Sequence, residues 1–184
     1  MLTLIIGGAR SGKTRYAQSL CSPALRVAYV ATARPEDEEM LARIERHRGD
    51  RPGGWKTIEE PLALAAAIRR ASPEADVILI DCLTVWLSNL CWELRDEATA
   101  EIECAALAEI DGIAAAAEKR HVILVSNEVG GGIVPDNPVG RSFREVQGLV
   151  NQRAAAAAQR VFLMVAGIPL PLRIKPGRPE ELEQ

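Results

Sequence analysis

The stretch "LTLIIGGARSGKT" (residues 2–14) joins an apolar run to a glycine-rich loop and the start of a helical pattern. Within it, Gly7-x-x-x-x-Gly12-Lys13-Thr14 has the Walker A spacing. Glycines let backbone N–H groups converge on phosphate oxygens, the lysine reaches the terminal phosphates, and the threonine hydroxyl takes a Mg²⁺ position. A helix that opens at this point also favours anions at its N-terminus. The residues expected to hold a nucleoside triphosphate are Gly7, Gly8, Ala9, Arg10, Ser11, Gly12, Lys13 and Thr14.

Apolar runs alternate with helical patterns along the rest of the chain. After the run at 2–7, the runs lie at 26–32, 76–81, 121–127 and 160–167, and the helical patterns lie at 13–21, 36–48, 61–71, 83–94, 97–119 and 138–158. Strands that are apolar throughout are typical of a parallel sheet covered on both faces. We therefore predict an α/β fold: a single doubly wound, mostly parallel sheet with the RecA-like character of P-loop NTPases. One domain is expected over residues 1–175, followed by a flexible tail at 176–184.

Composition argues against several classes of protein. A net charge of −3 provides no positive field for nucleic acid, and 4% aromatic residues leave few stacking surfaces for single strands. No apolar run approaches the roughly 20 residues that span a bilayer, and "MLTLII" lacks the basic region of a signal peptide. The four cysteines form no C-x-x-C pair, so we expect reduced, mostly buried thiols and a cytoplasmic protein.

The run "DVILID" (residues 76–81) ends in an acid, Asp81. A carboxylate at the carboxyl end of a buried strand lies beside the crevice where such sheets bind ligands. In a Walker B role it coordinates Mg²⁺ directly or through water. Capping of the helix that begins at residue 83 is the alternative, and the two roles are compatible. Thr14 and Asp81 are therefore the expected metal ligands.

A polar, glycine-rich segment follows the run at 121–127. Asn127, Glu128 and the glycines at 130–132 either line a substrate or nucleotide site at the end of that strand or form a tight turn. Arg141 and Arg144 fall on one face of the next helical pattern, as substrate contacts or as solvated charges. The pair "NP" at 137–138 predicts the start of that helix, with Asn as N-cap and Pro at the first position.

The two histidines differ in their surroundings. His121 opens an apolar strand and is interpreted as a strand-edge residue. His47 falls on the same helical face as Met40 and Ile44, the face expected to pack against the body. Arginines crowd this segment at positions 43, 46, 48 and 51. They either complement the helix dipole or disfavour the protonated imidazole, leaving a neutral, nucleophilic histidine beside guanidinium groups suited to polyphosphate.

Five blocks together resemble one family. They are "GGARSGKT" (7–14), "YVATARPEDEEMLARIERHRGDRP" (29–52), "WKTIEE" (55–60), "SNEVGGGIVPDN" (126–137) and "NQRAAAAAQRVFLMVAGI" (151–168). In collinear order from residue 1 to about 175 they are similar to the bifunctional adenosylcobinamide kinase / adenosylcobinamide-phosphate guanylyltransferase family. The chain departs from many members in having Arg46 where they have a second histidine, and members vary between Glu and Asp at position 81. The proline-rich end after residue 167 is longer than expected.

The resemblance implies two reactions that build the nucleotide loop of adenosylcobalamin. A nucleoside triphosphate phosphorylates the aminopropanol hydroxyl of adenosylcobinamide, and GTP then donates GMP to that phosphate, releasing pyrophosphate. His47 matches the family's guanylylated histidine, and Lys13 is expected to act in both steps. The resemblance implies Mg²⁺, ATP and GTP, a corrinoid acceptor, and a homotrimer with sites near subunit boundaries. Beyond the loop at 7–14, the implied nucleotide contacts are Thr32, Ala33, Arg34, Arg48, Gly49, Asp50, Arg51, Glu59 and Asp81.

Two rival hypotheses use the same phosphate loop. A monofunctional small-molecule kinase needs the Walker A residues but no reactive histidine. A non-enzymatic switch needs nucleotide binding only to order its loops. A covalent GMP adduct on His47 distinguishes the bifunctional enzyme from both.

Overall fold

The computed structural model describes residues 1–35, 38–49 and 51–175. Asp50 and the tail predicted at 176–184 lie outside the described residues. Within the helix at 38–49, the backbone is described but the side chains of residues 39, 40, 43, 46 and 47 are not. The predicted shared face of Met40, Ile44 and His47 therefore stays a prediction, with Ile44 half-buried.

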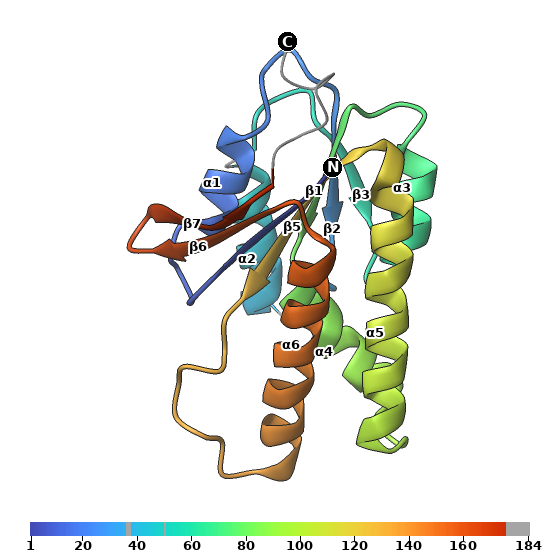
Figure 1. Cartoon of the computed structure of the whole chain (residues 1–184), viewed down its shortest axis with the longest axis vertical. Coiled ribbons are helices and arrows are strands. Elements are labelled where there is room, and N and C mark those ends of the chain that lie inside the picture. The colour runs from blue at the N-terminus through green and yellow to red at the C-terminus, as the bar shows by residue number, and fades with distance from the viewer. Residues whose placement is uncertain (36–37, 50, 176–184) are drawn as a thin grey trace.

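Seven strands and seven helical segments make up the described chain. In order they are β1 (Leu2–Gly7), α1 (Lys13–Ser19), β2 (Val27–Ala31), α2 (Glu38–Gly49), β3 (Lys56–Glu59), α3 (Leu64–Ala71), β4 (Val77–Asp81), α4 (Leu83–Glu93), α5 (Thr99–Ala116), η1 (Ala117–Lys119), β5 (His121–Asn127), α6 (Pro138–Ala157), β6 (Arg160–Val165) and β7 (Ile168–Ile174). Figure 1 shows them as one sheet flanked by helices.

The strands form one sheet in the order β3-β2-β4-β5-β1-β6-β7. Every neighbouring pair is parallel except β6 and β7. Strand β5 lies between β1, which leads into the phosphate loop, and β4, which carries Asp81. The carboxyl ends of the parallel strands share one edge, so the segments that follow them meet there. The predicted single, mostly parallel α/β sheet is confirmed.

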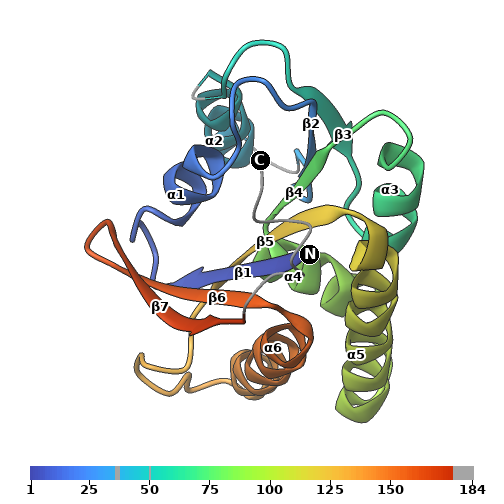
Figure 2. The same ribbon diagram turned by 45° about the horizontal axis from the view of Figure 1, so that its top comes forward.

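Two apolar layers, one on each face of the sheet, make the fold doubly wound. On one face, alternate strand residues such as Ile78 and Ile80 pack with α3, α4, α5 and α6. On the other face, the intervening residues such as Leu79 pack with α1. Figures 1 and 2 place α2 beside α1 on this second side. This division explains the uniformly apolar strands, because both side-chain directions are buried.

Strand β7 was not predicted from the sequence. The strand expected to run to residue 167 ends at Val165, and Ala166 and Gly167 turn the chain with φ angles of 50° and 82°. The chain then returns antiparallel to β6. Pro169 and Pro171 obscured this strand, since proline is tolerated in edge strands but argues against a central one.

The predicted helix boundaries that fall on described residues hold with one clear exception, and the start predicted at residue 36 lies outside the described residues. Helix α3 begins at Leu64 rather than at residue 61, because the Glu60 carboxylate accepts hydrogen bonds from the N–H groups of Leu62 and Ala63 at 3.3 and 2.9 Å. The predicted cap of α6 is confirmed: Asn137 accepts a hydrogen bond from the N–H of Gly140 at 2.7 Å, and Pro138 is the first helical residue.

The four cysteines are free, as predicted, but not uniformly buried. Cys21 and Cys82 are buried, Cys91 is half-buried and Cys104 is exposed. Burial raises the pKa of the Cys21 thiol to about 11. None of the helices in the described ranges is long and apolar enough to cross a membrane.

His121 makes the stability of the fold sensitive to acid. It is the first residue of β5, and its Nε2 is buried without a partner among the described residues. Burial, the N-terminal ammonium group and Arg160 together lower its pKa to about 4. Because the unfolded chain has the ordinary value of about 6.5, it binds more protons than the native state between these values. Stability present above about pH 6.5 is therefore lost as pH falls toward 4.

We expect urea unfolding to show this loss directly. The unfolding midpoint of the wild type should fall between about pH 6.5 and about pH 4, and His121→Asn should show a shallower fall because it has no imidazole to protonate. Equal pH slopes for the two proteins would show that His121 does not cause the loss.

Candidate active site

The candidate site lies at the carboxyl edge of the sheet. The phosphate loop follows β1, the turn at 32–34 follows β2, the acid Asp81 ends β4, and a glycine-rich loop follows β5. Figure 2 shows α1 and α2 lying together on one side of this edge. The sheet order therefore brings together segments that are far apart in sequence.

The phosphate loop is preformed around Lys13. The Lys13 side chain is buried, and its Nζ donates to the carbonyl oxygens of Gly7 and Gly8 at 3.0 and 2.6 Å. Gly12, with φ of 93°, is the N-cap of α1, in a left-handed conformation that favours glycine. Lys13 therefore already points back over the loop, where terminal phosphate oxygens are expected.

The turn between β6 and β7 supports the loop from one side. The N–H of Gly167 donates to the carbonyl oxygen of Ser11 at 3.0 Å. A Cβ on Gly12 would lie 3.2 Å from the Gly167 Cα, and a Cβ on Gly7 would lie 2.6 Å from the Met164 carbonyl oxygen. The motif glycines are thus required by this hairpin as well as by a phosphate group.

The structure brings the two predicted metal ligands together. The Thr14 hydroxyl donates to Asp81 Oδ2 at 2.9 Å. The N-cap of α4 is Cys82, with no side-chain cap, so the Asp81 carboxylate turns toward the phosphate loop instead of capping that helix. Carboxylate and hydroxyl oxygens suit Mg²⁺, which typically keeps water and phosphate oxygens as its other ligands. The described residues contain no group of three or more His, Cys, Asp or Glu side chains that could enclose a metal.

Tyr29 is a site residue that the sequence did not reveal. Its hydroxyl donates to the same Asp81 Oδ2 at 2.8 Å, and its ring is buried. Burial, with the charge of Asp81, raises the pKa of Tyr29, so the phenol stays a donor at neutral pH. The signal was a polar-tipped aromatic within the apolar strand β2, because a buried tyrosine hydroxyl needs a partner. The register pairs Ala31 with Asp81, so Tyr29, two residues earlier, faces the same side.

Arg51 connects this network to the segment after α2. Its guanidinium carbon lies 3.6 Å from the centre of the Tyr29 ring, and its Nη1 donates to Thr57 Oγ1 at 3.1 Å. Three hydrogen-bonded or stacked contacts therefore join Arg51, Tyr29, Asp81 and Thr14 in series. Tyr29, which the sequence did not predict, therefore links Arg51 to the predicted metal ligands Thr14 and Asp81.

The last turn of α2 is tied to β3. Arg48 forms an ion pair with Glu59, and both side chains are exposed. Gly49, the last residue of α2, is exposed as well. The side chain of His47 and the whole of Asp50 lie outside the description, so their contacts stay predictions.

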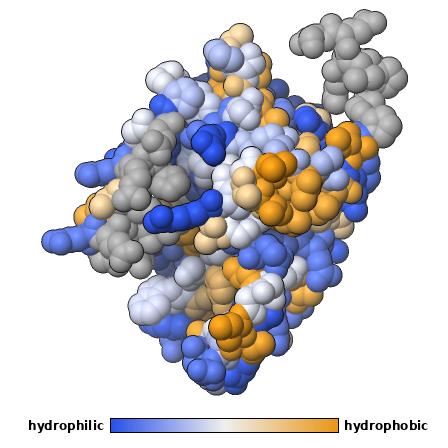
Figure 3. All heavy atoms as spheres, turned by 90° about the vertical axis from the view of Figure 1, so that its left-hand side faces the viewer, coloured by the Kyte–Doolittle hydropathy of each residue, from blue (hydrophilic) through white to orange (hydrophobic). Residues whose placement is uncertain are grey.

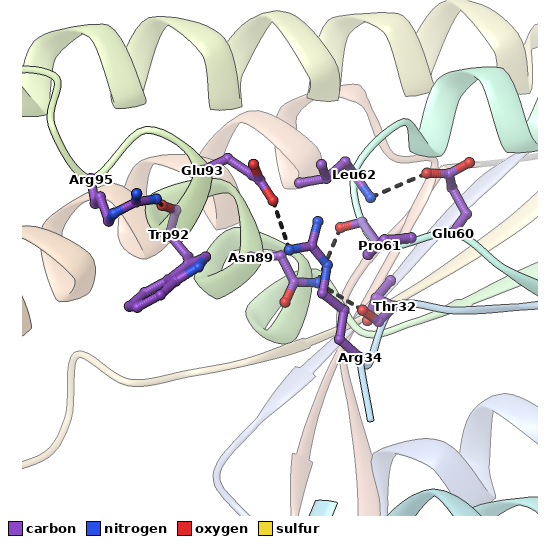
Figure 4. Close-up of polar contacts among 9 residues, drawn as sticks. All are labelled: Thr32, Arg34, Glu60, Pro61, Leu62, Asn89, Trp92, Glu93 and Arg95. Atoms are coloured by element: carbon purple, nitrogen blue, oxygen red, sulfur yellow. Dashed lines mark hydrogen bonds and ion pairs between the residues drawn. The ribbon is translucent and has the colours of Figure 1, made fainter. Parts of the chain in front are cut away.

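The predicted turn at 32–34 is held by α4 (Figure 4). Thr32 Oγ1 donates to the Cys82 carbonyl oxygen at 3.0 Å and accepts from the Cys82 N–H at 2.9 Å. Asn89 donates to the carbonyl oxygens of Thr32 and Pro61 at 2.8 and 3.1 Å. The Thr32 hydroxyl is thus engaged in holding β2 to the end of β4.

Arg34 extends toward α4 and pairs with Glu93 at 2.7 Å (Figure 4). The neighbouring Ala33 is half-buried. In this arrangement the Arg34 guanidinium is directed to the helix. Its predicted contact with a nucleotide, like that of Ala33, stays a prediction.

The glycine-rich segment after β5 is a long loop at residues 128–137, and α6 holds it in place. Arg144 donates to the Gly130 carbonyl oxygen, and Arg141 donates to those of Pro135 and Asp136 at 3.1 and 2.7 Å. These arginines therefore position the loop backbone, a role that the sequence did not predict; the two interpretations made from the sequence stay open. The sequence cannot reveal this role, because every residue has a backbone carbonyl and residue type does not show which one an arginine binds.

Comparison with known proteins agrees with this geometry. The family model "Cobinamide kinase / cobinamide phosphate guanyltransferase" matches residues 3–172. The chain is 43% identical over 182 residues to the bifunctional adenosylcobalamin biosynthesis protein CobP of Pseudomonas aeruginosa, covering 96% of this chain and 99% of that protein. It is 41% identical to the bifunctional adenosylcobalamin biosynthesis protein CobU of Escherichia coli and 43% identical to CobU of Salmonella typhimurium, each over 176 residues, 91% of this chain and 97% of the relative. The chain belongs to the cobinamide kinase / cobinamide phosphate guanyltransferase family.

Proposed function

We propose that the protein phosphorylates adenosylcobinamide with a nucleoside triphosphate and then transfers GMP from GTP to adenosylcobinamide phosphate. The products of the second step are adenosylcobinamide-GDP and pyrophosphate. The observation that carries this proposal is the phosphate loop with buried Lys13 and the Thr14–Asp81 contact, in a chain that matches the family over residues 3–172. Its relatives are named as bifunctional proteins of adenosylcobalamin biosynthesis.

The kinase step rests on positioning and charge stabilisation. Lys13 now binds two loop carbonyls, and γ-phosphate oxygens would replace them as partners. Thr14 and Asp81 would hold a Mg²⁺ ion, which neutralises charge on the terminal phosphates when bound. Residues 8–10 are exposed, which leaves the loop accessible to the nucleotide.

The guanylyl step would use His47 as a nucleophile on the α-phosphorus of GTP. A histidine–phosphorus bond forms while the bond to pyrophosphate breaks, and the acceptor phosphate then displaces the histidine. The ion pair of Arg48 with Glu59 and the packing of Arg51 on Tyr29 fasten the chain just after His47 to β3 and β2. These contacts support a fixed position for the helix end that carries the nucleophile.

A covalent adduct is the sharpest test of the bifunctional proposal. With α-labelled GTP and Mg²⁺, the wild type should acquire label that is stable in alkali and lost in acid. His47→Ala should abolish the adduct and keep cobinamide phosphorylation, whereas Lys13→Ala should impair both steps by about 100-fold or more, as loss of a preorganised charge contact does. A wild type that phosphorylates cobinamide without forming an adduct would be a monofunctional kinase. One that binds nucleotide and does neither would be a switch.

The Tyr29–Asp81 hydrogen bond predicts a specific defect in metal use. Tyr29→Phe removes one donor from the carboxylate that we assign to Mg²⁺ binding. The Mg²⁺ concentration for half-maximal kinase activity should change by about tenfold, with kcat at saturating Mg²⁺ nearly kept, because a hydrogen bond to a charged group contributes about 1.5–3 kcal/mol. Tyr16→Phe is the matched control, since Tyr16 packs edge-on against Phe162. Identical Mg²⁺ titrations of the two variants would contradict this assignment.

We also propose a cytoplasmic homotrimer whose contact surface includes β7. Four side chains at alternate positions of this edge strand, Ile168, Leu170, Leu172 and Ile174, are 45–62% exposed. Figure 3 faces the side to which the β6–β7 hairpin extends in Figure 1, and apolar side chains gather on it. Exposed apolar edge strands favour association, and a further copy of the chain is the proposed partner.

Light scattering coupled to size exclusion should give a trimer mass for the wild type and a lower mass for Leu172→Lys, because burying an unpaired lysine is unfavourable. Leu25→Lys, at a 37% exposed position before β2, should keep the trimer mass. A monomeric wild type would contradict the homotrimer, and a trimeric Leu172→Lys would place the interface elsewhere.

A further inference from the structure

A cavity of about 570 Å³ opens beside the phosphate loop, and no residue of it is used in the steps above except the loop itself. Residues 8–11 form one wall, Glu128 and residues 131–132 form the second, and residues 163–166 form the third. The cavity thus lies between the ends of β1, β5 and β6, neighbours or near neighbours in the sheet.

Glu128 is placed at the phosphate loop by the sheet itself. Strand β5 pairs with β1 so that Asn127 lies opposite Gly7, and the N–H of Glu128 donates to the Gly7 carbonyl oxygen at 3.0 Å. Its Oε1 accepts from the N–H of Gly130 at 2.5 Å, which orients the carboxylate. An acid therefore lies directly beside the loop expected to hold the γ-phosphate.

The rest of the cavity is bounded by loop backbone on one side and by apolar side chains on the other. A Cβ on Gly131 would meet nothing within 4 Å, so this wall is open space bounded by bare backbone. Arg141 and Arg144 hold the loop from α6, so the wall has a defined position. Leu163 and Val165 supply apolar surface on the other side.

Apolar surface continues along the loop beyond the cavity. Ile133 is 97% exposed and Val134 is 59% exposed, directly after the glycines of the second wall. Exposing several large apolar side chains to water is unfavourable. When they lie beside a cavity, they mark a contact surface for a large, partly apolar ligand. Their position fits an acceptor whose reactive arm enters the cavity while its body rests outside.

We propose that this cavity binds the hydroxyl-bearing arm of the corrinoid acceptor and that Glu128 is the general base of the kinase step. The inference rests on the proposed function, whose acceptor residues it names. Glu128 takes the hydroxyl proton as the alcohol oxygen bonds to the γ-phosphorus. The bond from that phosphorus to the β–γ bridging oxygen breaks, so the products are a phosphate ester and a nucleoside diphosphate, and the proton passes from Glu128 to water.

The two reactions depend on Glu128 differently. The alcohol of the first step must lose a proton, whereas the phosphate acceptor of the second step is already ionised at neutral pH. A base is therefore required in one step only, while the cavity wall serves the same arm in both. This asymmetry separates a catalytic role of Glu128 from a merely structural one.

Glu128→Gln should lower phosphoryl transfer from γ-labelled ATP to adenosylcobinamide by about 100- to 1,000-fold, within the range of general base catalysis. GMP transfer from α-labelled GTP to adenosylcobinamide phosphate prepared separately should stay within about twofold of the wild type. Glu118→Gln, the same change at an exposed position before β5, should affect neither reaction. Wild-type phosphorylation by Glu128→Gln, or an equal loss in both reactions, would overturn the role of Glu128.

Gly131→Leu tests the cavity independently, because a Cβ at this position meets nothing within 4 Å and residue 131 lines the space assigned to the acceptor. The KM for the corrinoid should rise about tenfold or more in both reactions, as a blocked pocket implies, while the GMP adduct formed without acceptor stays at the wild-type level. Gly148→Leu on α6, also without close neighbours, is the control. An unchanged corrinoid KM would overturn the cavity assignment.

If the wild type itself transferred neither the phosphoryl group nor GMP, the proposed function would fail, and this inference with it.

Discussion

The site depends on one carboxylate oxygen, Asp81 Oδ2, which accepts hydrogen bonds from both Thr14 and Tyr29. A partly buried carboxylate is costly unless it is hydrogen-bonded, so these two donors stabilise the Asp81 side chain in this position. Thr14 belongs to α1, Tyr29 to β2 and Asp81 to β4, so one oxygen fixes a helix and two strands relative to each other. The geometry of the phosphate loop is therefore coupled to the sheet through this oxygen.

Backbone contacts hold the loop on its other side. Gly167 donates to Ser11, and the close approach of Gly7 to Met164 leaves no room for a side chain. Thus β6 and its turn to β7 constrain the loop from one flank, and the Asp81 network constrains it from the other. A loop held on both flanks can bind phosphate with little reorganisation, which is the condition for electrostatic stabilisation of a transferred group.

The sequence predicted those features that depend on local pattern. The Walker glycines, Lys13 and the acid Asp81 were found because strand, loop and helix follow one another within a few residues, and strands buried on both faces have a uniform apolar pattern. Tyr29 was missed because its partner lies 52 residues away and one strand over. Strand β7 was missed because its prolines look like a loop, and the contact of Arg144 with the loop was missed because its partner is a backbone carbonyl. Each miss is a tertiary contact without a local signature.

The order of the strands separates the two chemical tasks that we propose. Arg48 and Arg51 pack against β3 and β2, at one end of the sheet, whereas Glu128 lies between β5 and β1, toward the other end. The phosphate loop lies with β1, and α1 carries Thr14 across β5 to reach Asp81. A nucleotide held there would present its γ-phosphate to the alcohol on the Glu128 flank and its α-phosphate to the helix that carries His47. The same Lys13 can then serve both reactions, because the reacting phosphorus differs while the position of the triphosphate does not.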